Sequence, residues 1–416
     1  MLYKEIEGCR ICGNQQLDLV LDLGNLALTG VFPKTKEEDV PTGPLTLIKC
    51  RETTTDNSCG LVQLKETYNP NLMYGQNYGY RSGLNKSMVN HLHKKVKKIL
   101  DHVTLNRNDV IVDIGSNDST LLQAYPKEHT VLVGFDPSGE KFKKYYPDHI
   151  TLVANFFSSA TFKRNFGNKK AKVITSIAMF YDLEDPVGFT QEVYDILSED
   201  GIWVFEQSYM PHMLKANSFD TICHEHQEYY RLKQIQWMME KVGFKIIDIE
   251  FNQTNGGSFS VIAAKSGSPL SETSDVAKFL RDEKNKGLST NRPYAEFRNQ
   301  VFKFKSSIRQ FLDKIYNEKG LVLGYGASTK GNVLLQFASI TPRDIPYIGE
   351  VNTDKFGCYT PGTLIPIISE EEARKMNPDY FFVFPWHFKD FILQKEKSSS
   401  NKKTSFIFPL PSTEIF

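Results

Sequence analysis

The chain has 416 residues, of which 40% are hydrophobic and 24% charged, and its net charge is +1. This composition predicts an ordinary globular protein of two or three domains, and so balanced a charge gives no sign of a nucleic-acid partner. The N-terminus carries charges at once, and no apolar run is long enough to span a bilayer. We therefore expect a cytoplasmic protein with neither a signal peptide nor a membrane partner.

Four of the six cysteines lie in the N-terminal segment, as two pairs. Cys9 and Cys12 form a C-x2-C knuckle, and Cys50 and Cys59 follow in the second pair. Four thiolates from two loops predict a closed tetrahedral site for structural zinc, which leaves no open position for catalysis. The C-x8-C spacing of the second pair is looser than usual, and the alternative is four unliganded thiols in a reducing compartment.

A loop rich in glycine and tyrosine follows at residues 74–85 and leads into a helix that the apolar spacing predicts over residues 86–102. Such a loop either covers an apolar surface or forms a lid whose phenols reach a ligand. Tyr78 and Tyr80 are the candidates for that second role.

The chain is organised around residues 109–122, where a buried parallel strand (109–114) precedes the turn Gly115-Ser-Asn-Asp and the start of a helix (119–125). A small residue after such a strand lets a ligand approach the backbone. The next strand, 130–136, ends in an acid that suits ribose hydroxyls. The dinucleotide fingerprint G-x-G-x-x-G is absent, and the pattern resembles the cofactor site of class I S-adenosylmethionine (SAM) methyltransferases. The alternative is any βαβ unit with a polar turn. The candidate cofactor-binding residues here are Asp113, Gly115, Asn117, Asp118 and Asp136.

Strands predicted at 150–153, 173–180, 201–206, 244–251 and 258–264 alternate with helices at 186–197 and 233–242, which is the order of a doubly wound α/β sheet. Asn155 and Phe156 follow the third strand, where a methyltransferase contacts the adenine. Met179 follows the fourth strand, at the border between cofactor and substrate.

The densest chemistry lies in residues 220–230, which contain His224, Glu225 and His226. The run H-E-H-Q-E is not a zincin H-E-x-x-H, because Glu228 stands where the second histidine would be. The block lies beyond the fifth strand, where a class I methyltransferase places its acceptor. A lone histidine is more often structural, but a histidine–glutamate pair over a cofactor crevice favours general acid–base work.

Six motifs occur in order along almost the whole chain: C-x2-C, Y-x-Y-x-S-G-x-N-x-x-M, D-I-G-S-N-D, M-F-Y-D-L-x-D-P, E-Q-S-Y-M-P and H-E-H-x-E-Y-Y. Together they resemble the nucleotide-deoxysugar C-methyltransferases, of the type that methylates C-3′ of a dTDP-4-keto-deoxysugar. The stretched second cysteine pair and Ser119, where the family more often has glycine, depart from the pattern. The resemblance implies SAM, structural zinc, and three domains at 1–85 (zinc-binding), 86–266 (class I methyltransferase, Rossmann-like) and 267–416 (a second Rossmann-like domain).

In the C-terminal segment, helices are predicted at 274–286 and 293–317, and a second strand–turn–helix unit, G-Y-G-A-S-T-K-G, spans residues 320–335. Its backbone N–H groups could form an anion cradle, although the glycines could also serve packing alone. The resemblance favours a nucleotide-binding domain, with the sugar nucleotide between domains. The candidate substrate-binding residues are Tyr209, Tyr229, Tyr325, Lys330, Asn332 and Tyr359.

The expected reaction is methyl transfer from SAM to a ring carbon of a nucleotide-linked 4-keto-deoxysugar. His226 is the candidate base and Glu225 its orienting partner, while Tyr78, Tyr80 and His224 are candidates for hydrogen bonds to the keto or enolate oxygen. Spacing does not decide between His224 and His226 as base. The alternatives are an O-methyltransferase acting on a sugar hydroxyl, and an NAD-dependent sugar oxidoreductase or nucleotide-sugar binding protein. The resemblance also implies a monomer.

Overall fold

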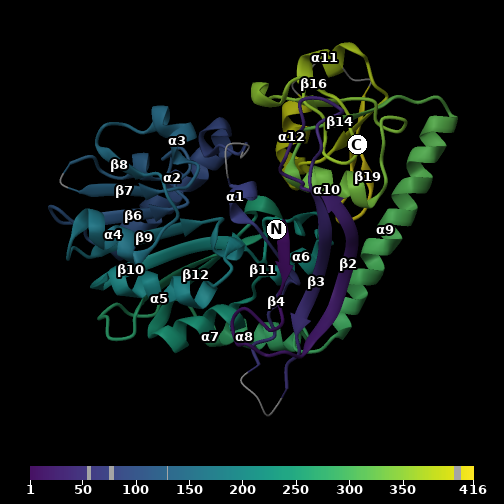
Figure 1. The fold of residues 1–416 in the computed structure, drawn as a ribbon. Helices are drawn as coiled ribbons and strands as arrows, with labels where there is room; N and C mark the ends of the chain where they lie inside the picture. Colours follow the sequence, from purple (N-terminus) through teal and green to yellow (C-terminus); the bar gives the residue numbers. More distant parts are fainter. Residues whose placement is uncertain (54–57, 75–78, 129, 398–403) are drawn as a thin grey trace.

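The computed structural model describes residues 1–53, 58–74, 79–128, 130–397 and 404–416. Their strands form sheets of two, four, six and seven strands. The four-stranded N-terminal sheet lies between the two larger sheets, and the long helix α9 (Arg292–Asn317) runs along its outer side (Figure 1). None of the described helices combines the length and the apolarity that a bilayer crossing needs.

The four-stranded sheet is antiparallel, with the order β11-β4-β3-β2. Its strands are β2 (Leu17–Ala27), β3 (Thr42–Cys50), β4 (Val62–Leu64) and β11 (Glu228–Tyr229). The edge strand β11 comes from the histidine-rich block, far along the chain. β1 (Tyr3–Glu5) and β5 (Glu66–Tyr68) pair beside this sheet. One short piece of the central segment therefore completes the N-terminal sheet.

The seven-stranded central sheet has the order β12-β13-β10-β9-β6-β7-β8, and its five strands from β10 to β8 are parallel. The strands are β6 (Val110–Ile114), β7 (Val131–Phe135), β8 (Ile150–Val153), β9 (Ala171–Ile177), β10 (Leu197–Ser208), β12 (Phe244–Asn252) and β13 (Ser258–Lys265). The chain winds outward from β6 to β8 and then returns to β9 on the other side. The carboxyl ends of β6 and β9 therefore form the switch point where open α/β sheets bind ligands.

The central sheet is accompanied by α1 (Pro70–Met73), α2 (Lys86–His102), α3 (Gly139–Phe142), α4 (Ser159–Phe166), α5 (Pro186–Ile196), α6 (Met210–Lys215) and α7 (Leu232–Val242). The prediction for α2 is confirmed, because the Asn85 side chain caps its first turn and Leu92, Val96 and Ile99 are buried on one face. The helix predicted from residue 119 is wrong: only a 3-10 turn (Leu122–Ala124) forms, since Ser119 has a left-handed φ of 63°.

The C-terminal sheet has the order β16-β15-β14-β17-β18-β19 and is parallel except at β19. Its strands are β14 (Val322–Tyr325), β15 (Ile348–Glu350), β16 (Ile367–Ser369), β17 (Tyr380–Val383), β18 (Ser405–Phe408) and β19 (Glu414–Ile415). The helices of the C-terminal segment are α8 (Val276–Asn285), which packs against α7 and β12 of the central sheet, and α9, α10 (Thr329–Phe337), α11 (Glu370–Lys375) and α12 (Lys389–Lys397).

Hydrophobic packing divides the N-terminal segment between both neighbours. Leu45 and Leu47 share one core with Phe219 of the central segment and Ile348 of the C-terminal sheet. The four N-terminal cysteines belong instead to the core of the central sheet, with Cys12 partly buried against it. The histidine-rich block thus lies where three parts of the chain meet.

Candidate active site

A cavity of about 380 Å³ opens at the switch point of the central sheet. Its wall includes Gly115 after β6, Asp136 after β7, Met179 after β9 and Glu206 within β10. The histidine-rich block contributes further side chains, and Lys330 enters from the C-terminal sheet. One cavity therefore joins the predicted cofactor turn to the predicted acid–base block.

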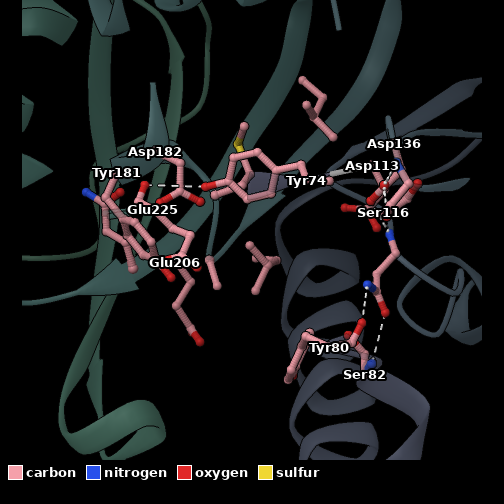
Figure 2. Close-up of a pocket in the computed structure, with 18 of the residues that line it drawn as sticks. Tyr74, Tyr80, Ser82, Asp113, Ser116, Asp136, Tyr181, Asp182, Glu206 and Glu225 are labelled. Carbon is pink, nitrogen blue, oxygen red and sulfur yellow. Dashed lines mark hydrogen bonds between the residues drawn. The ribbon is translucent and has the colours of Figure 1, made fainter. Parts of the chain in front are cut away.

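The cofactor end is built on the turn after β6. Gly115 has a φ of 76°, and a Cβ atom placed there would lie 3.1 Å from the Met179 Cγ, so this turn requires glycine. The Asn117 backbone N–H donates to Asp136 Oδ2 at 2.8 Å, and the Asp136 carboxylate lines the cavity beside it (Figure 2). An acid at this position can accept hydrogen bonds from ribose hydroxyls.

Asp113 is the next-to-last residue of β6 and also lines the cavity, where it is almost fully buried. Burial raises the pKa of its carboxyl to about 7, although Thr175 Oγ1 donates to Asp113 Oδ1 at 2.5 Å and opposes that rise. An acid whose charge is suppressed near neutral pH therefore lies two residues before Gly115 of the turn.

The tyrosine-rich loop closes against the same turn. The Asn117 amide accepts from the Ser82 backbone N–H at 2.9 Å and donates to the Tyr80 carbonyl at 3.1 Å (Figure 2). Tyr80 lines the cavity, whereas Tyr78 lies outside the described residues. The predicted lid is therefore tied to the cofactor turn by Asn117 and also by Asp118, which accepts from the Gly83 backbone N–H.

Two further cofactor candidates, Phe156 and Met179, line the cavity, and two others do not. Asp118 accepts from the Gly83 backbone N–H at 2.9 Å, and Asn155 accepts from the backbone N–H of Phe156 at 2.8 Å. These two side chains shape the loops around the cavity instead of facing into it.

His226 lies at the other end of the cavity, with its ring edge against Tyr181 at a centroid distance of 4.5 Å. Its Nδ1 is 2.8 Å from the Thr221 carbonyl oxygen, which can only accept, so Nδ1 carries the proton in the neutral ring. Nε2 is then the atom with a free lone pair. Burial and the charge of Lys330 lower the pKa of His226 to about 4, which keeps the ring unprotonated near pH 7.

His224 points away from the cavity, into the N-terminal segment. Its Nδ1 lies 3.4 Å from both the backbone nitrogen and Oγ1 of Thr29, and its ring packs edge-on against Tyr68 at 4.7 Å. Burial lowers the pKa of His224 to about 4 as well. Of the two candidate bases, His226 is the one that the structure brings to the cavity.

Glu225 lines the cavity near the N-terminal segment, where its Oε2 lies 3.4 Å from Thr29 Oγ1, and burial raises the pKa of its carboxyl. Tyr74 and Asp182, which sequence reasoning did not single out, lie beside it (Figure 2). The Tyr74 hydroxyl donates to the Glu225 carbonyl at 3.3 Å, and burial raises the pKa of Asp182. Both residues lie in motifs visible in the sequence, the tyrosine-rich loop and M-F-Y-D-L.

Glu206, the first residue of E-Q-S-Y-M-P, is another cavity residue that sequence reasoning missed. His91 Nε2 donates to its Oε1 at 2.6 Å, and Lys95 Nζ lies 2.8 Å from its Oε2. Burial alone would raise the pKa of Glu206, but the His91 hydrogen bond and the Lys95 charge outweigh it and lower the pKa to about 2. The cavity thus contains a fixed negative charge.

Lys330 is the substrate candidate that reaches the cavity, from the first turn of α10. Burial lowers its pKa, while the buried carboxylate of Asp220 opposes that shift. The other substrate candidates are held elsewhere. Tyr209 donates to Glu283, Tyr229 to the Thr221 carbonyl, Asn332 to the Thr29 carbonyl; Tyr325 contacts Lys395, and the Tyr359 backbone N–H donates to the Pro33 carbonyl.

The four N-terminal cysteines meet at one point, with all four Sγ atoms within 4.8 Å of one another. The Cys9–Cys59 and Cys12–Cys50 Sγ distances are 3.4 and 3.6 Å. A tetrahedral zinc with Zn–S bonds of about 2.3 Å separates its sulfurs by about 3.8 Å, so the cluster fits the metal. The loose spacing of the second pair is accommodated, because Cys50 ends β3 and the chain returns to the cluster at Cys59.

Three family models match consecutive parts of the chain. Residues 9–74 match a zinc binding domain, residues 87–249 a methyltransferase domain, and residues 253–411 a C-methyltransferase C-terminal domain. Together the matches follow the order in which the cysteine cluster, the cavity and the C-terminal sheet occur.

The chain is also similar to individual proteins. The C-methyltransferase NovU of Streptomyces niveus is 27% identical over 419 residues, which cover 100% of this chain and 98% of that protein. A complex of the Haloferax volcanii Trm112 methyltransferase activator with a methyltransferase is similar at 15% identity and a TM-score of 0.36, over 44% of this chain and 94% of that chain. Magnesium protoporphyrin IX methyltransferase from Synechocystis PCC 6803, with bound SAM, is similar at 12% identity and a TM-score of 0.32, over 43% of this chain and 79% of that chain.

Proposed function

We propose that this SAM-dependent methyltransferase with an N-terminal zinc-binding domain acts on a nucleotide-linked 4-keto-deoxysugar and methylates it at C-3′. The observation that carries this proposal is the neutral His226 ring, whose unprotonated Nε2 belongs to the same cavity as the cofactor turn. A carbon acceptor needs such a base, because carbon becomes nucleophilic only after it loses a proton.

The 4-keto group makes the C-3′ proton acidic enough for one side chain to remove it. His226 Nε2 accepts that proton while Nδ1 keeps its hydrogen bond to the Thr221 carbonyl. The negative charge moves to the keto oxygen as the enolate forms. Lys330, whose ammonium is close enough to lower the pKa of His226, is placed to stabilise this charge, and Tyr80 is a second donor in the cavity wall.

Asp136 and Asn117 hold the cofactor end, and Gly115 leaves the room that the cofactor needs. Bound SAM supplies a methyl group that its sulfonium has already activated. Glu225 also lines the cavity, and because the Thr221 carbonyl already holds the His226 ring, we infer that Glu225 orients the sugar and not the imidazole.

The test is the mass of the product. The purified protein is incubated with SAM and a panel of dTDP-, GDP- and CDP-linked 4-keto-6-deoxysugars, and deuterium exchange at C-3′ is followed in heavy water without SAM. We expect a gain of one methyl group on a keto sugar, together with exchange at the methylated carbon. A methyl group that appears only on the reduced sugars, without exchange, would contradict C-methylation and favour an O-methyltransferase.

A further inference from the structure

The loop that carries His226 ends as an edge strand of the N-terminal sheet. In the antiparallel pair of β11 with β4, Glu228 lies opposite Gln63. One residue earlier, the Leu64 backbone N–H donates to the Gln227 carbonyl at 2.8 Å. The backbone immediately after His226 is therefore held from two sides, by the zinc-binding segment and by the Tyr181 carbonyl beyond β9, to which the Gln227 backbone N–H donates at 2.9 Å.

Arg10 lies between the two cysteines of the first knuckle and reaches the same strand. Its guanidinium donates to the Leu64 carbonyl at 2.6 Å, to the Glu66 carbonyl at 3.0 Å and to Thr67 Oγ1 at 2.7 Å. Its backbone N–H donates to Gln63 Oε1 at 3.1 Å. Because a guanidinium is planar and makes several directed bonds at once, these contacts fix its position.

The Arg10 guanidinium also faces Glu228. Arg10 Nε lies 3.5 Å from Glu228 Oε1, and the two side chains are 2% and 0% exposed. Within the described part of the chain, Arg10 is the cation that pairs with this carboxylate. Burial raises the pKa of the Glu228 carboxyl and the charge of Arg10 opposes that rise, so this buried side chain is best accommodated beside the guanidinium.

We propose that Arg10 is a positioning residue for His226, which it orients through Glu228. The cysteine knuckle holds Arg10, Arg10 holds Glu228, and β11 holds the loop so that His226 Nδ1 meets the Thr221 carbonyl and Nε2 remains free. The kinetic part of this inference rests on the proposed function, whereas the orientation of the ring does not.

The test uses Arg10→Met and Glu228→Gln in the full chain. Histidine labelled with 15N reports which ring nitrogen of His226 carries the proton, and the signal is assigned by its loss in His226→Ala. We expect the wild-type ring to be protonated at Nδ1, and both variants to shift toward the Nε2–H form. We also expect kcat to fall about 10–100-fold with an unchanged KM for SAM and unchanged zinc content, because a small misplacement of a catalytic group has effects of this size.

The matched control is Glu52→Gln, which breaks another buried ion pair between the same segments. Glu52 pairs with Arg231 and Lys233 at the start of α7, after β11 has ended. We expect this variant to lower the melting temperature without changing kcat or the His226 signal. If Arg10→Met and Glu228→Gln leave the His226 signal as in the wild type, or reduce kcat no more than the control does, the inference is wrong. If the wild type methylates no keto sugar, the proposed function fails, and the 15N signal still decides the orientation of the ring.

Discussion

The central and C-terminal sheets each contain a strand and turn braced by an acid from the neighbouring strand, and of these two acids only the central one lines the cavity. In the central sheet, Asp136 at the end of β7 accepts from the Asn117 backbone N–H of the turn at 2.8 Å. In the C-terminal sheet, Glu350 at the end of β15 accepts from the Ala327 backbone N–H of its turn, also at 2.8 Å. The two acids make the same contact with the same part of the fold.

The difference lies in what else surrounds each acid. Both acids also accept from the backbone that follows them, Asp136 from the Ser138 N–H at 2.7 Å and Glu350 from the Val351 and Asn352 N–H groups at 2.6 and 2.9 Å, but only Asp136 of the two lines the cavity. Lys355 donates to the Ala327 carbonyl at 2.7 Å and packs over the Phe32 ring. The protein's own side chains thus cover the second turn, and the C-terminal unit reaches the cavity through Thr329 and Lys330 at the start of α10. The sheet topology creates a turn suited to a cofactor in both units. Such a turn can bind a cofactor only where the protein's own side chains do not cover it.

The largest effect should come from the base at the open site. His226→Ala removes the nitrogen that accepts the proton, so we expect methyl transfer to fall by about 10²–10⁴-fold. The cofactor turn is untouched, and the affinity for SAM should not change. Single-turnover rates with a keto sugar and calorimetric titration of SAM measure the two quantities. A rate near that of the wild type would remove His226 from the mechanism.

Lys330→Met tests what the C-terminal unit contributes. Loss of a cation that stabilises the developing oxyanion should slow the reaction by about 10²–10³-fold, since single oxyanion donors have effects of this size. Deuterium exchange at C-3′ without SAM isolates the step. If exchange keeps its rate and only the KM for the sugar nucleotide rises, Lys330 binds the substrate and does not stabilise the enolate.

The variants Asp136→Ala and Glu350→Ala test directly whether the two turns differ in function. A charged hydrogen bond contributes about 1.5–3 kcal/mol, so Asp136→Ala should weaken SAM binding by about 10–100-fold. Glu350→Ala should leave SAM affinity unchanged and lower the free energy of unfolding by about 1–3 kcal/mol, because it orphans buried N–H groups. Equal losses of SAM affinity in both variants would show that the two turns do not differ in function.

The smallest expected effect is the change of kcat/KM with pH. Because the pKa of His226 is lowered to about 4, the base stays deprotonated and kcat/KM should be nearly flat between pH 8 and 6, within the limits set by other groups. A fall of kcat/KM with a midpoint near the ordinary histidine pKa of about 6.5 would contradict this.

The pH dependence of stability follows from the same two lowered pKa values. The contribution of His224 and His226 to the free energy of unfolding is present above about pH 6.5 and is lost as the pH falls toward about 4, because the unfolded chain binds protons more readily in that range. Chemical denaturation across that window checks the sign.

The sequence predicted what depends on local pattern. The apolar spacing of α2, the strands of the central sheet and the grouping of the four cysteines are all visible in short stretches of residues. The role of an acid at a strand end is not visible in the local sequence. Asp136 and Glu350 occupy equivalent positions, and they differ in the side chains that cover them.

The sequence also does not predict the direction in which side chains in loops point. His224 and His226 are two residues apart, but no regular strand imposes a direction on them, and tertiary contacts alone turn one toward Thr29 and the other toward the cavity. Tyr209 and Tyr229 resembled ligand contacts, yet their hydroxyls find partners within the protein. The left-handed φ of Ser119, which prevents the predicted helix, has no signature in residue type either.

The pairing of β11 with β4 has a consequence for exchanging parts between related proteins. A breakpoint anywhere between Tyr68 and Glu228 gives the two strands different parents. The hybrid would inherit Gln63 and Arg10 from one protein and Glu228, with the reactive loop, from the other. Shuffling along the apparent boundaries would therefore separate residues that work as a unit, so a transplant of this chemistry must include the zinc knuckle.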